Sequence, residues 1–467
     1  MKKIALLAVA VLLLFVTACG GNGKQMLDRL TKEDILSDFD YMMQLMEDTF
    51  PHFDVAKRRF GVDIRALAQR TRDKIENYPY FMQSLAAELG IDLNDLPELD
   101  KHIFWSIVHH EFLGPLFPLG HITMLDSTVY SLLFPRFSRY FPKEHYPASY
   151  FNYQVFRNPT TQNFYEEHKS LFLTLATEDP ALFSFIFRTR IAIPSQSRIT
   201  TNIIEEGRIA YIYVPSFMGG FFAPGAQLNA FYDRIQNYEH LIIDIRDNIG
   251  GGVDFWRMLI MYPLWSDRDN MPNMPLYAFY RDNELGRLWG EAHVKEEISL
   301  SSSRYVPETD YLLTVTEIFA TSYLPYFNEN DFQRFSYGIR LNTSLSNIEQ
   351  SHFANFGITG RRIPFKGQIW LLINEHNLSA AALFARHAKH MNFATLVGES
   401  TGGAYTWIMP MHFALPNTGI IVGWDVDYLV DQYGRSLEEF PTTPHYFNRP
   451  GLDALETVLQ LIEEGSY

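Results

Sequence analysis

Four short apolar segments in the second half of the chain constrain its fold more than any other feature. Each is a near-continuous apolar run, as strands buried on both faces are, and a stretch with helical spacing follows three of them. The expected strands are Ile209–Val214, Leu241–Ile245, Ile369–Ile373 and Ala394–Val397, and the expected helices are Gln227–Ile235, Val253–Met261 and Ser379–Met391. Strands that alternate with crossover helices form a mostly parallel sheet, so the sequence predicts an α/β fold.

The first half of the chain predicts a different organisation. Residues 30–126 have helical patterns: Thr31 can cap a helix, and apolar side chains follow it at helical spacing. Residues 127–199 are rich in Phe and Tyr with scattered Pro, and a short insert of helices is compatible with them. We therefore expect an N-terminal helical region at 30–126, a connecting insert at 127–199 and an α/β core at 200–467.

The N-terminus has the layout of an export signal. Lys2 and Lys3 precede an apolar run, Ile4–Val16, that is too short to span a bilayer. The run ends at Cys19, the only cysteine of the sequence, in a context that resembles the lipobox of bacterial lipoproteins. That resemblance implies a signal peptide at 1–18, lipidation of Cys19 and a flexible tether at 19–29. A plain secretory signal with an incidental cysteine is the alternative. Either way, an extracytoplasmic location is expected, and the lipid would anchor the chain to the cell envelope.

The acidic balance of the chain limits its partners. The formal net charge is −15, and removal of Lys2 and Lys3 with the signal gives −15 − 2 = −17. Such a charge argues against nucleic acid or an anionic membrane surface as a partner. The lipid alone would then link the chain to the membrane.

Ser379 lies between an expected buried strand and an expected helix, in the segment Asn374–Ala382. Its hydroxyl would be exposed at the carboxyl end of the strand, where open α/β sheets bind ligands. The free N–H groups of the helix start would point to the same place. This is the placement of a catalytic nucleophile, although a helix-capping serine is an alternative on these residues alone.

A glycine-rich turn follows another buried strand, in Asp244–Gly252. Consecutive glycines allow backbone N–H groups to converge on an anion, as an acyl-transfer enzyme requires for its oxyanion. A phosphate site is a rival use, but the sequence has neither a dinucleotide-binding glycine motif nor a P-loop. A tight turn without a ligand is the third possibility.

Together these segments resemble the tail-specific, or C-terminal-processing, serine peptidases, whose relatives include the tricorn protease core and the interphotoreceptor retinoid-binding modules. The glycine turn matches the pattern Asp-Ile-Arg-x-Asn-x-Gly-Gly of that family, and three other blocks match in the expected order. These blocks are Leu119–Thr123, Gly207–Phe217, and Leu378–Ala382 with the following Ala394–Gly403. The resemblance implies a ClpP/crotonase-like protease core and hydrolysis of peptide bonds.

The resemblance also implies roles for individual residues. Ser379 would carry the acyl group, and the backbone N–H groups of Ala380 and of Gly250 or Gly251 would form the oxyanion hole. Asp244 and Arg246 would support the glycine turn structurally.

Two base systems occur in the family, and this sequence favours the Ser–His–Glu type. A Ser–Lys dyad needs a lysine soon after the Thr401–Gly403 turn, and none follows; Lys389 lies about three helical turns from Ser379. His121 fits the histidine of the other type, as general base.

The acidic member of the triad is predicted at Glu438, with Glu439 as second choice. Both precede a proline-rich segment near the C-terminus, where the family has a glutamate before a Gly-x-x-Pro element. Here Pro441 replaces the usual glycine, and His445 follows the last proline.

Other features predict neither a metal nor a cofactor. His387 and His390 are three residues apart on an expected helix, and a surface helix face explains them without a metal. The sequence thus predicts a serine endopeptidase that acts on extracytoplasmic proteins or peptides. The alternative is a catalytically silent protein that binds an apolar ligand on the same fold, with Phe and Tyr residues of 130–190 lining the pocket.

Overall fold

The computed structural model describes residues 30–80, 98–178, 198–267, 273–300, 306–348, 353–354 and 356–467. The predicted signal peptide, the tether and Cys19 therefore lie outside the described residues. The described chain forms two compact units. Unit 1 contains the described part of Met1–Ala192 with Asn283–Ala292 and Met409–Val426. Unit 2 contains the described part of Ile193–Asp282, His293–Ile408 and Asp427–Tyr467.

Unit 2 contains a six-stranded sheet in the order β14-β10-β9-β4-β3-β2. Every neighbouring pair is parallel except β2 with β3. The bounds are β2 Thr200–Glu205, β3 Ile209–Tyr213, β4 His240–Asp244, β9 Gln368–Ile373, β10 Thr395–Gly398 and β14 Tyr446–Phe447. All five residues of β4 are buried, as are five of the six residues of β9, which explains their continuous apolar sequence.

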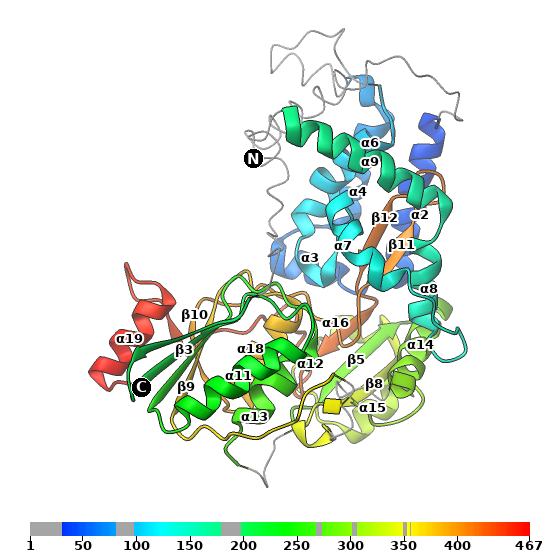
Figure 1. Ribbon diagram of the computed structural model, residues 1–467. Helices are drawn as coiled ribbons and strands as arrows, with labels where there is room; N and C mark the ends of the chain where they lie inside the picture. Colours follow the sequence, from blue (N-terminus) through cyan, green and yellow to red (C-terminus); the bar gives the residue numbers. More distant parts are fainter. Residues whose placement is uncertain are drawn as a thin grey trace. The chain divides into compact units, whose positions relative to one another are not determined.

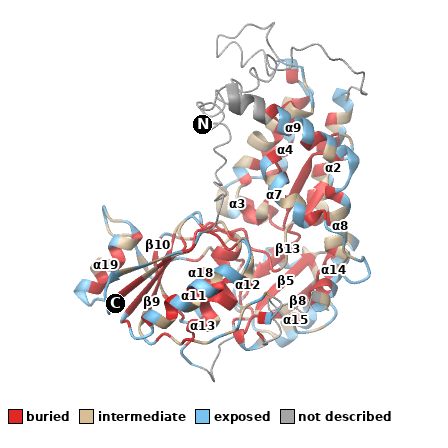
Figure 2. Ribbon diagram, in the orientation of Figure 1, coloured by how far each residue is buried: buried red, intermediate tan, exposed pale blue. Residues whose placement is uncertain are grey.

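Helices cover both faces of this sheet (Figure 1). One layer contains α11 Phe222–Ile235, α12 Val253–Trp256, α13 Tyr262–Leu264 and α18 Ser379–His390, and a π-helix, Arg257–Met261, joins α12 to α13. The other face packs on α19, Ala454–Glu464, whose Val458 and Leu461 join one core cluster with Trp370 and Leu372 of β9. Figure 2 shows β9 and β10 as buried strands.

A second sheet in unit 2 is antiparallel and has the strand order β13-β5-β8-β6, with β7 also paired to β8. Its strands are β5 Leu276–Arg281, β6 Val306–Pro307, β7 Leu313–Thr314, β8 Phe335–Asn342 and β13 Asp427–Val430. The short helices α15 Val315–Thr321 and α16 Glu329–Phe332 and a 3₁₀ turn, Leu345–Asn347, belong to the same part of the chain. The sequence patterns did not predict this sheet.

Unit 1 is mostly helical. Its helices are α2 Lys32–Thr49, α3 Phe53–Phe60, α4 Ile64–Glu76, α6 Lys101–Ile107, α7 Ser127–Phe137, α8 Pro147–Phe156 and α9 Pro159–Glu178. A π-helix, Val108–Leu113, and 3₁₀ turns, Gly114–Leu116 and Leu119–His121, lead into strand β1, Thr123–Met124. Strand β1 pairs with β12, Ile421–Trp424, which pairs with β11, Met411–Ala414. Helix α14, Glu284–Leu300, contributes its first residues to unit 1.

The predicted fold class is confirmed, and the four strands and three helices expected in the core are present with small shifts at their ends. Strands β11 and β12 form an antiparallel hairpin that belongs to unit 1, although it falls inside the range 200–467. Thr31 caps α2, as predicted, and exchanges hydrogen bonds with Asp34. Among the residues that the structure describes, no helix combines the length and apolarity needed to cross a membrane.

Candidate active site

Ser379 lies at the junction of a buried parallel strand and a helix. Strand β9 ends at Ile373, and Ser379 is the first residue of α18. Its φ of 52° is in the left-handed region, which non-glycine residues rarely adopt and which is enriched at functional sites. The Ser379 N–H donates a hydrogen bond to the carbonyl oxygen of Gly403 (3.0 Å), which helps to hold this conformation.

The glycine turn after β4 lies directly against Ser379. A Cβ atom placed on Gly250 would lie 2.8 Å from Ser379 Cβ and 3.0 Å from the Ala380 nitrogen, so only glycine allows this approach. The Gly250 N–H donates to Asn248 Oδ1 (2.8 Å). In the described part of the chain, no acceptor lies within hydrogen-bond distance of the N–H groups of Gly251 and Ala380. Of the three predicted donors, these two are therefore available to an anion.

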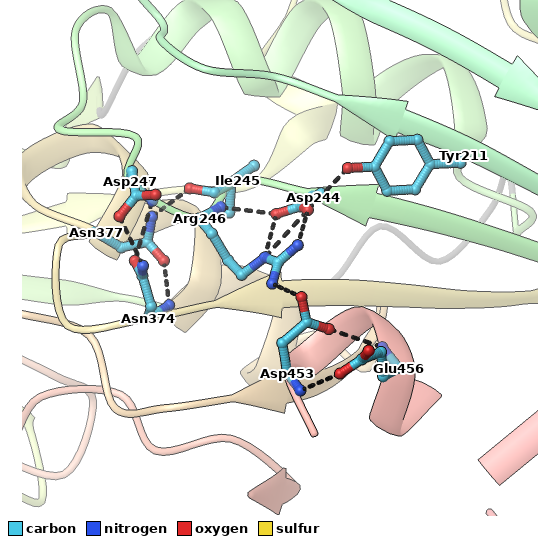
Figure 3. A network of polar contacts seen from close by, with 9 residues as sticks. All are labelled: Tyr211, Asp244, Ile245, Arg246, Asp247, Asn374, Asn377, Asp453 and Glu456. Carbon is cyan, nitrogen blue, oxygen red and sulfur yellow. Dashed lines mark hydrogen bonds and ion pairs between the residues drawn. The ribbon is translucent and has the colours of Figure 1, made fainter. Parts of the chain in front are cut away.

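Arg246 anchors the glycine turn to two other elements (Figure 3). Its guanidinium forms a two-pronged ion pair with Asp244 at the end of β4, with Nη2 2.7 Å from Oδ2, and its Nη1 lies 2.9 Å from Asp453 Oδ2. Asp453 is the N-cap of α19. Tyr211 also donates to Asp244 (2.8 Å), and burial together with this carboxylate raises the pKa of Tyr211. These contacts tie the end of β4 to the start of α19.

A set of polar contacts, which we call the clasp, joins the glycine turn to the loop before Ser379. Asp247 and Asn374 exchange hydrogen bonds of 3.0 and 2.8 Å, and the nearby His376 Nδ1 lies 2.7 Å from Asp247 Oδ1. Asn377 also donates to the carbonyl oxygen of Ile245 (Figure 3). Burial opposes ionisation of Asp247, but these hydrogen bonds outweigh it and lower the pKa of that carboxyl group. The clasp fixes the glycine turn relative to Ser379.

In unit 1, His121 is paired with a carboxylate that the sequence analysis missed. His121 Nδ1 lies 2.8 Å from Oδ2 and 2.9 Å from Oδ1 of Asp425, which is fully buried. The Asp425 N–H also donates to the carbonyl oxygen of Gly120 (2.8 Å). Gly120 and His121 both have left-handed φ values, of 54° and 51°. Asp425 follows β12 without any motif around it, so its sequence context gave no signal.

Two other histidines of unit 1 interact electrostatically with His121. Burial, with smaller contributions from the positive charges of protonated His121 and of Arg58, lowers the pKa of His52 to about 3. Burial lowers the pKa of His412 to about 3 as well, with smaller contributions from His121 and Arg136. Both imidazoles are therefore neutral near pH 7.

Glu438 lies in unit 2 and accepts a hydrogen bond from the backbone N–H of Tyr405. Its side chain is fully buried. Tyr405 follows the turn whose Gly403 carbonyl oxygen accepts the Ser379 N–H. Glu439, the second choice, is partly exposed, and its N–H donates to Ser436 Oγ. His121 is thus paired with Asp425, and the predicted contribution of Glu438 to a triad stays a prediction.

The expectation of a surface face for His387 is wrong. Helix α18 is buried from Ala380 to Ala388, and His387 Nδ1 lies 2.8 Å from the carbonyl oxygen of Leu383. Burial lowers the pKa of His387 to about 3. Lys389 on the same helix donates to Thr443 at its carbonyl oxygen and hydroxyl (2.7 and 3.0 Å). Within the described ranges, no group of three or more His, Cys, Asp or Glu side chains is arranged to hold a metal ion.

Comparison with known proteins identifies the family. The sequence description of Peptidase family S41 matches residues 208–447, just over half of the chain. The chain belongs to peptidase family S41. This match contains the glycine turn, Ser379 and Glu438, and it supports a serine peptidase whose substrates are peptides or proteins.

Solved structures similar to this S41 family member are distant in sequence. A putative peptidase from Parabacteroides merdae is 14% identical, with 93% of this chain and 97% of the other covered and a TM-score of 0.46. Mature CPAF in complex with lactacystin is 13% identical, with 89% and 94% covered and a TM-score of 0.46. A lipoprotein from Streptococcus agalactiae is 12% identical, with 95% and 99% covered and a TM-score of 0.42. No curated protein matches the chain.

Proposed function

We propose that this S41 peptidase hydrolyses peptide bonds of extracytoplasmic proteins or peptides through an acyl-enzyme on Ser379. The observation that carries the proposal is the junction at Ser379. The nucleophile has a left-handed φ, the Gly250 backbone lies against it, and the N–H groups of Gly251 and Ala380 are available beside it. A helix-capping serine needs no free N–H groups beside its hydroxyl, whereas an acyl-transfer site needs such donors for its oxyanion.

The proposed reaction uses His121 as the general base. His121 takes the proton of the Ser379 hydroxyl as Oγ attacks the carbonyl carbon of the substrate, and the Gly251 and Ala380 N–H groups donate to the resulting oxyanion. When the tetrahedral intermediate collapses, the C–N bond breaks and His121 protonates the leaving amine. In the second half of the reaction, His121 takes a proton from a water molecule as the water attacks the acyl ester. It then returns this proton to Ser379 Oγ as the ester bond breaks. The proposal requires that His121 and Ser379 come within hydrogen-bond reach during the reaction.

The direct test is covalent labelling of the purified full-length chain, in detergent, with a serine-reactive phosphonate probe. We expect peptide mass spectrometry to find the label on Ser379, and we expect His121→Ala to lose it while retaining its thermal unfolding transition. Ser127→Ala is a matched control, because Ser127 is the first residue of α7 as Ser379 is of α18. A folded wild-type chain without label on Ser379 would contradict the proposal and favour the apolar-ligand protein.

We also propose that Cys19 is lipidated after cleavage of residues 1–18 and anchors the enzyme outside the cytoplasm. The proposal rests on the cysteine at the end of a short apolar run that has the layout of an export signal. Metabolic labelling with an alkyne fatty acid should modify the wild-type chain and leave Cys19→Ser unmodified. Equal labelling of both chains would exclude Cys19 as the anchor.

A further inference from the structure

We infer that Asp425 is the residue that positions the base His121, and that Glu438 instead supports the turn beneath the nucleophile. The inference deepens the proposed function and rests on it. It assigns Asp425 to the base and Glu438 to the segment that holds the nucleophile, whereas the family resemblance assigned the orienting role to Glu438 alone.

The contact between His121 and Asp425 has the geometry of a base and its orienting acid. Both carboxylate oxygens of Asp425 lie within 2.9 Å of Nδ1, so this nitrogen keeps the proton and donates a hydrogen bond to the carboxylate. The lone pair is then on Nε2, the atom that must accept the proton of a nucleophile. Because Asp425 is fully buried, little water screens its attraction for the imidazolium that forms during the reaction.

The strand register explains why these two residues meet. In the antiparallel pair of β1 and β12, Thr123 faces Gly423 and Met124 faces Val422. Two residues before Thr123 is His121, and two residues after Gly423 is Asp425, so the same register places them opposite each other. The hydrogen bond from the Asp425 N–H to the Gly120 carbonyl oxygen continues the ladder to this point.

The other titratable groups that act on His121 do not replace Asp425. His52 lies before α3 and His412 lies on β11, and burial keeps both of them neutral near pH 7. Arg58 and Arg136 are cations that act on His52 and His412 respectively, and a cation cannot stabilise an imidazolium. Asp425 instead brings a negative charge to within 2.8 Å of His121 Nδ1.

Glu438 contacts the backbone segment that holds Ser379. Its carboxylate accepts the Tyr405 N–H, and two residues earlier the Gly403 carbonyl oxygen accepts the Ser379 N–H. Gly403 also forms a parallel β-bridge with Leu378. Glu438 thus holds the backbone segment on which the conformation of Ser379 depends.

The test compares two isosteric variants, Asp425→Asn and Glu438→Gln, in the full-length chain. The measurement is the rate of phosphonate labelling of Ser379 across a range of pH. We expect Asp425→Asn to label roughly 10²–10⁴-fold more slowly near pH 7, because an amide donates to Nδ1 and leaves the proton on Nε2. The acid limb of its plot of labelling rate against pH should also move to lower pH by about one unit, because the imidazolium loses the negative charge beside it.

Glu438→Gln should keep the pH profile of the wild type and label less than about tenfold more slowly, since the amide oxygen can still accept the Tyr405 N–H. The inference is overturned if Glu438→Gln shifts the pH profile and Asp425→Asn does not. It is also overturned if both variants retain the profile of the wild type.

A second measurement keeps the inference testable if Asp425→Asn does not fold or if no labelling occurs at all. In a ¹⁵N-histidine-labelled wild-type chain, the proton on Nδ1 of His121 should give a strongly downfield signal that His121→Ala removes. Its absence from the folded wild type would reject the His121–Asp425 pair. Its presence without any labelling of Ser379 would leave the pair intact and contradict the proposed function instead.

Discussion

The nucleophile side and the base side of the proposed active site are built in different ways. Ser379 and its proposed oxyanion donors lie just beyond the ends of two neighbouring parallel strands, and a recognisable stretch of sequence marks each place. His121 and Asp425 are 304 positions apart and meet through the register of a short antiparallel ladder. The first arrangement is encoded in local motifs, whereas the second is encoded only in how distant strands pair.

The largest expected effect tests the nucleophile side through Gly250→Ala. The new Cβ would lie 2.8 Å from Ser379 Cβ, at a φ of +107° that side chains rarely adopt. We expect the rate of phosphonate labelling to fall roughly 10³-fold, because the nucleophile and the oxyanion donors must move apart.

Gly451→Ala is the matched control for this prediction. Gly451 has a φ of +80°, and a Cβ there would meet no atom within 4 Å, so it tests backbone strain without the collision. The control should label at nearly the rate of the wild type. A labelling rate for Gly250→Ala within tenfold of the wild type would show that the close approach of Gly250 does not matter.

The next effect tests the base side through Gly120→Ala. A Cβ on Gly120 would lie 2.7 Å from Cδ2 of His52 and 2.8 Å from Cε2 of Phe50. The turn must shift and carry His121 away from Asp425, so labelling should slow by roughly 100-fold. Urea unfolding should show a loss of about 1–3 kcal/mol from overpacking.

Gly61→Ala provides the control within the same unit. Gly61 follows α3 with a φ of +69°, and a Cβ there would meet nothing within 4 Å. It should lose about 1 kcal/mol of stability from strain alone and retain its labelling rate. If both variants label equally fast, the conformation of the Gly120 turn has no part in placing the base.

The contrast between the two sides also shows what the sequence could predict. The buried strands β4 and β9 were found because both faces are covered and nearly every residue is apolar. The antiparallel sheet around β5 was missed because its partners β8 and β13 lie far along the chain. Such pairing depends on contacts that no local window contains.

Individual side chains show the same limit. His387 was expected on a surface, but the small alanines of α18 let neighbouring elements approach on all sides, so even Arg386 on this helix is buried in an ion pair with Asp431 (2.6 Å). Asp425 could not be recognised because an acidic residue after a strand is ordinary in sequence. Only the pairing of β12 with β1 brings it to His121.

A smaller effect is expected when the clasp is weakened by Asn374→Ala. The variant loses both hydrogen bonds to Asp247 but keeps the ion pair of His376 with Asp247. We expect labelling to slow by roughly tenfold, because the glycine turn gains freedom relative to Ser379. Glu375→Ala is the control: Glu375 is exposed on the same loop, and its 3.8 Å ion pair with His376 leaves both hydrogen bonds between Asn374 and Asp247 in place, so the rate should change little. Equal rates for the two variants would show that the clasp does not order the oxyanion donors.

The smallest effect concerns stability in acid and distinguishes the buried histidine of the base side from an exposed one. The pKa of His52 is lowered to about 3 in the folded chain, so between pH 6.5 and about 3 the unfolded chain binds a proton that the folded chain does not. Stability is therefore lost as pH falls through this window, by up to about 1.4 kcal/mol for each pH unit from this group.

In urea unfolding at pH 6.5 and 5, His52→Phe should lose less stability on acidification than the wild type. His145→Gln, at an exposed position, should behave as the wild type does. An unchanged pH dependence in His52→Phe would mean that His52 is protonated in the folded chain, and the imidazole would then add a positive charge beside His121.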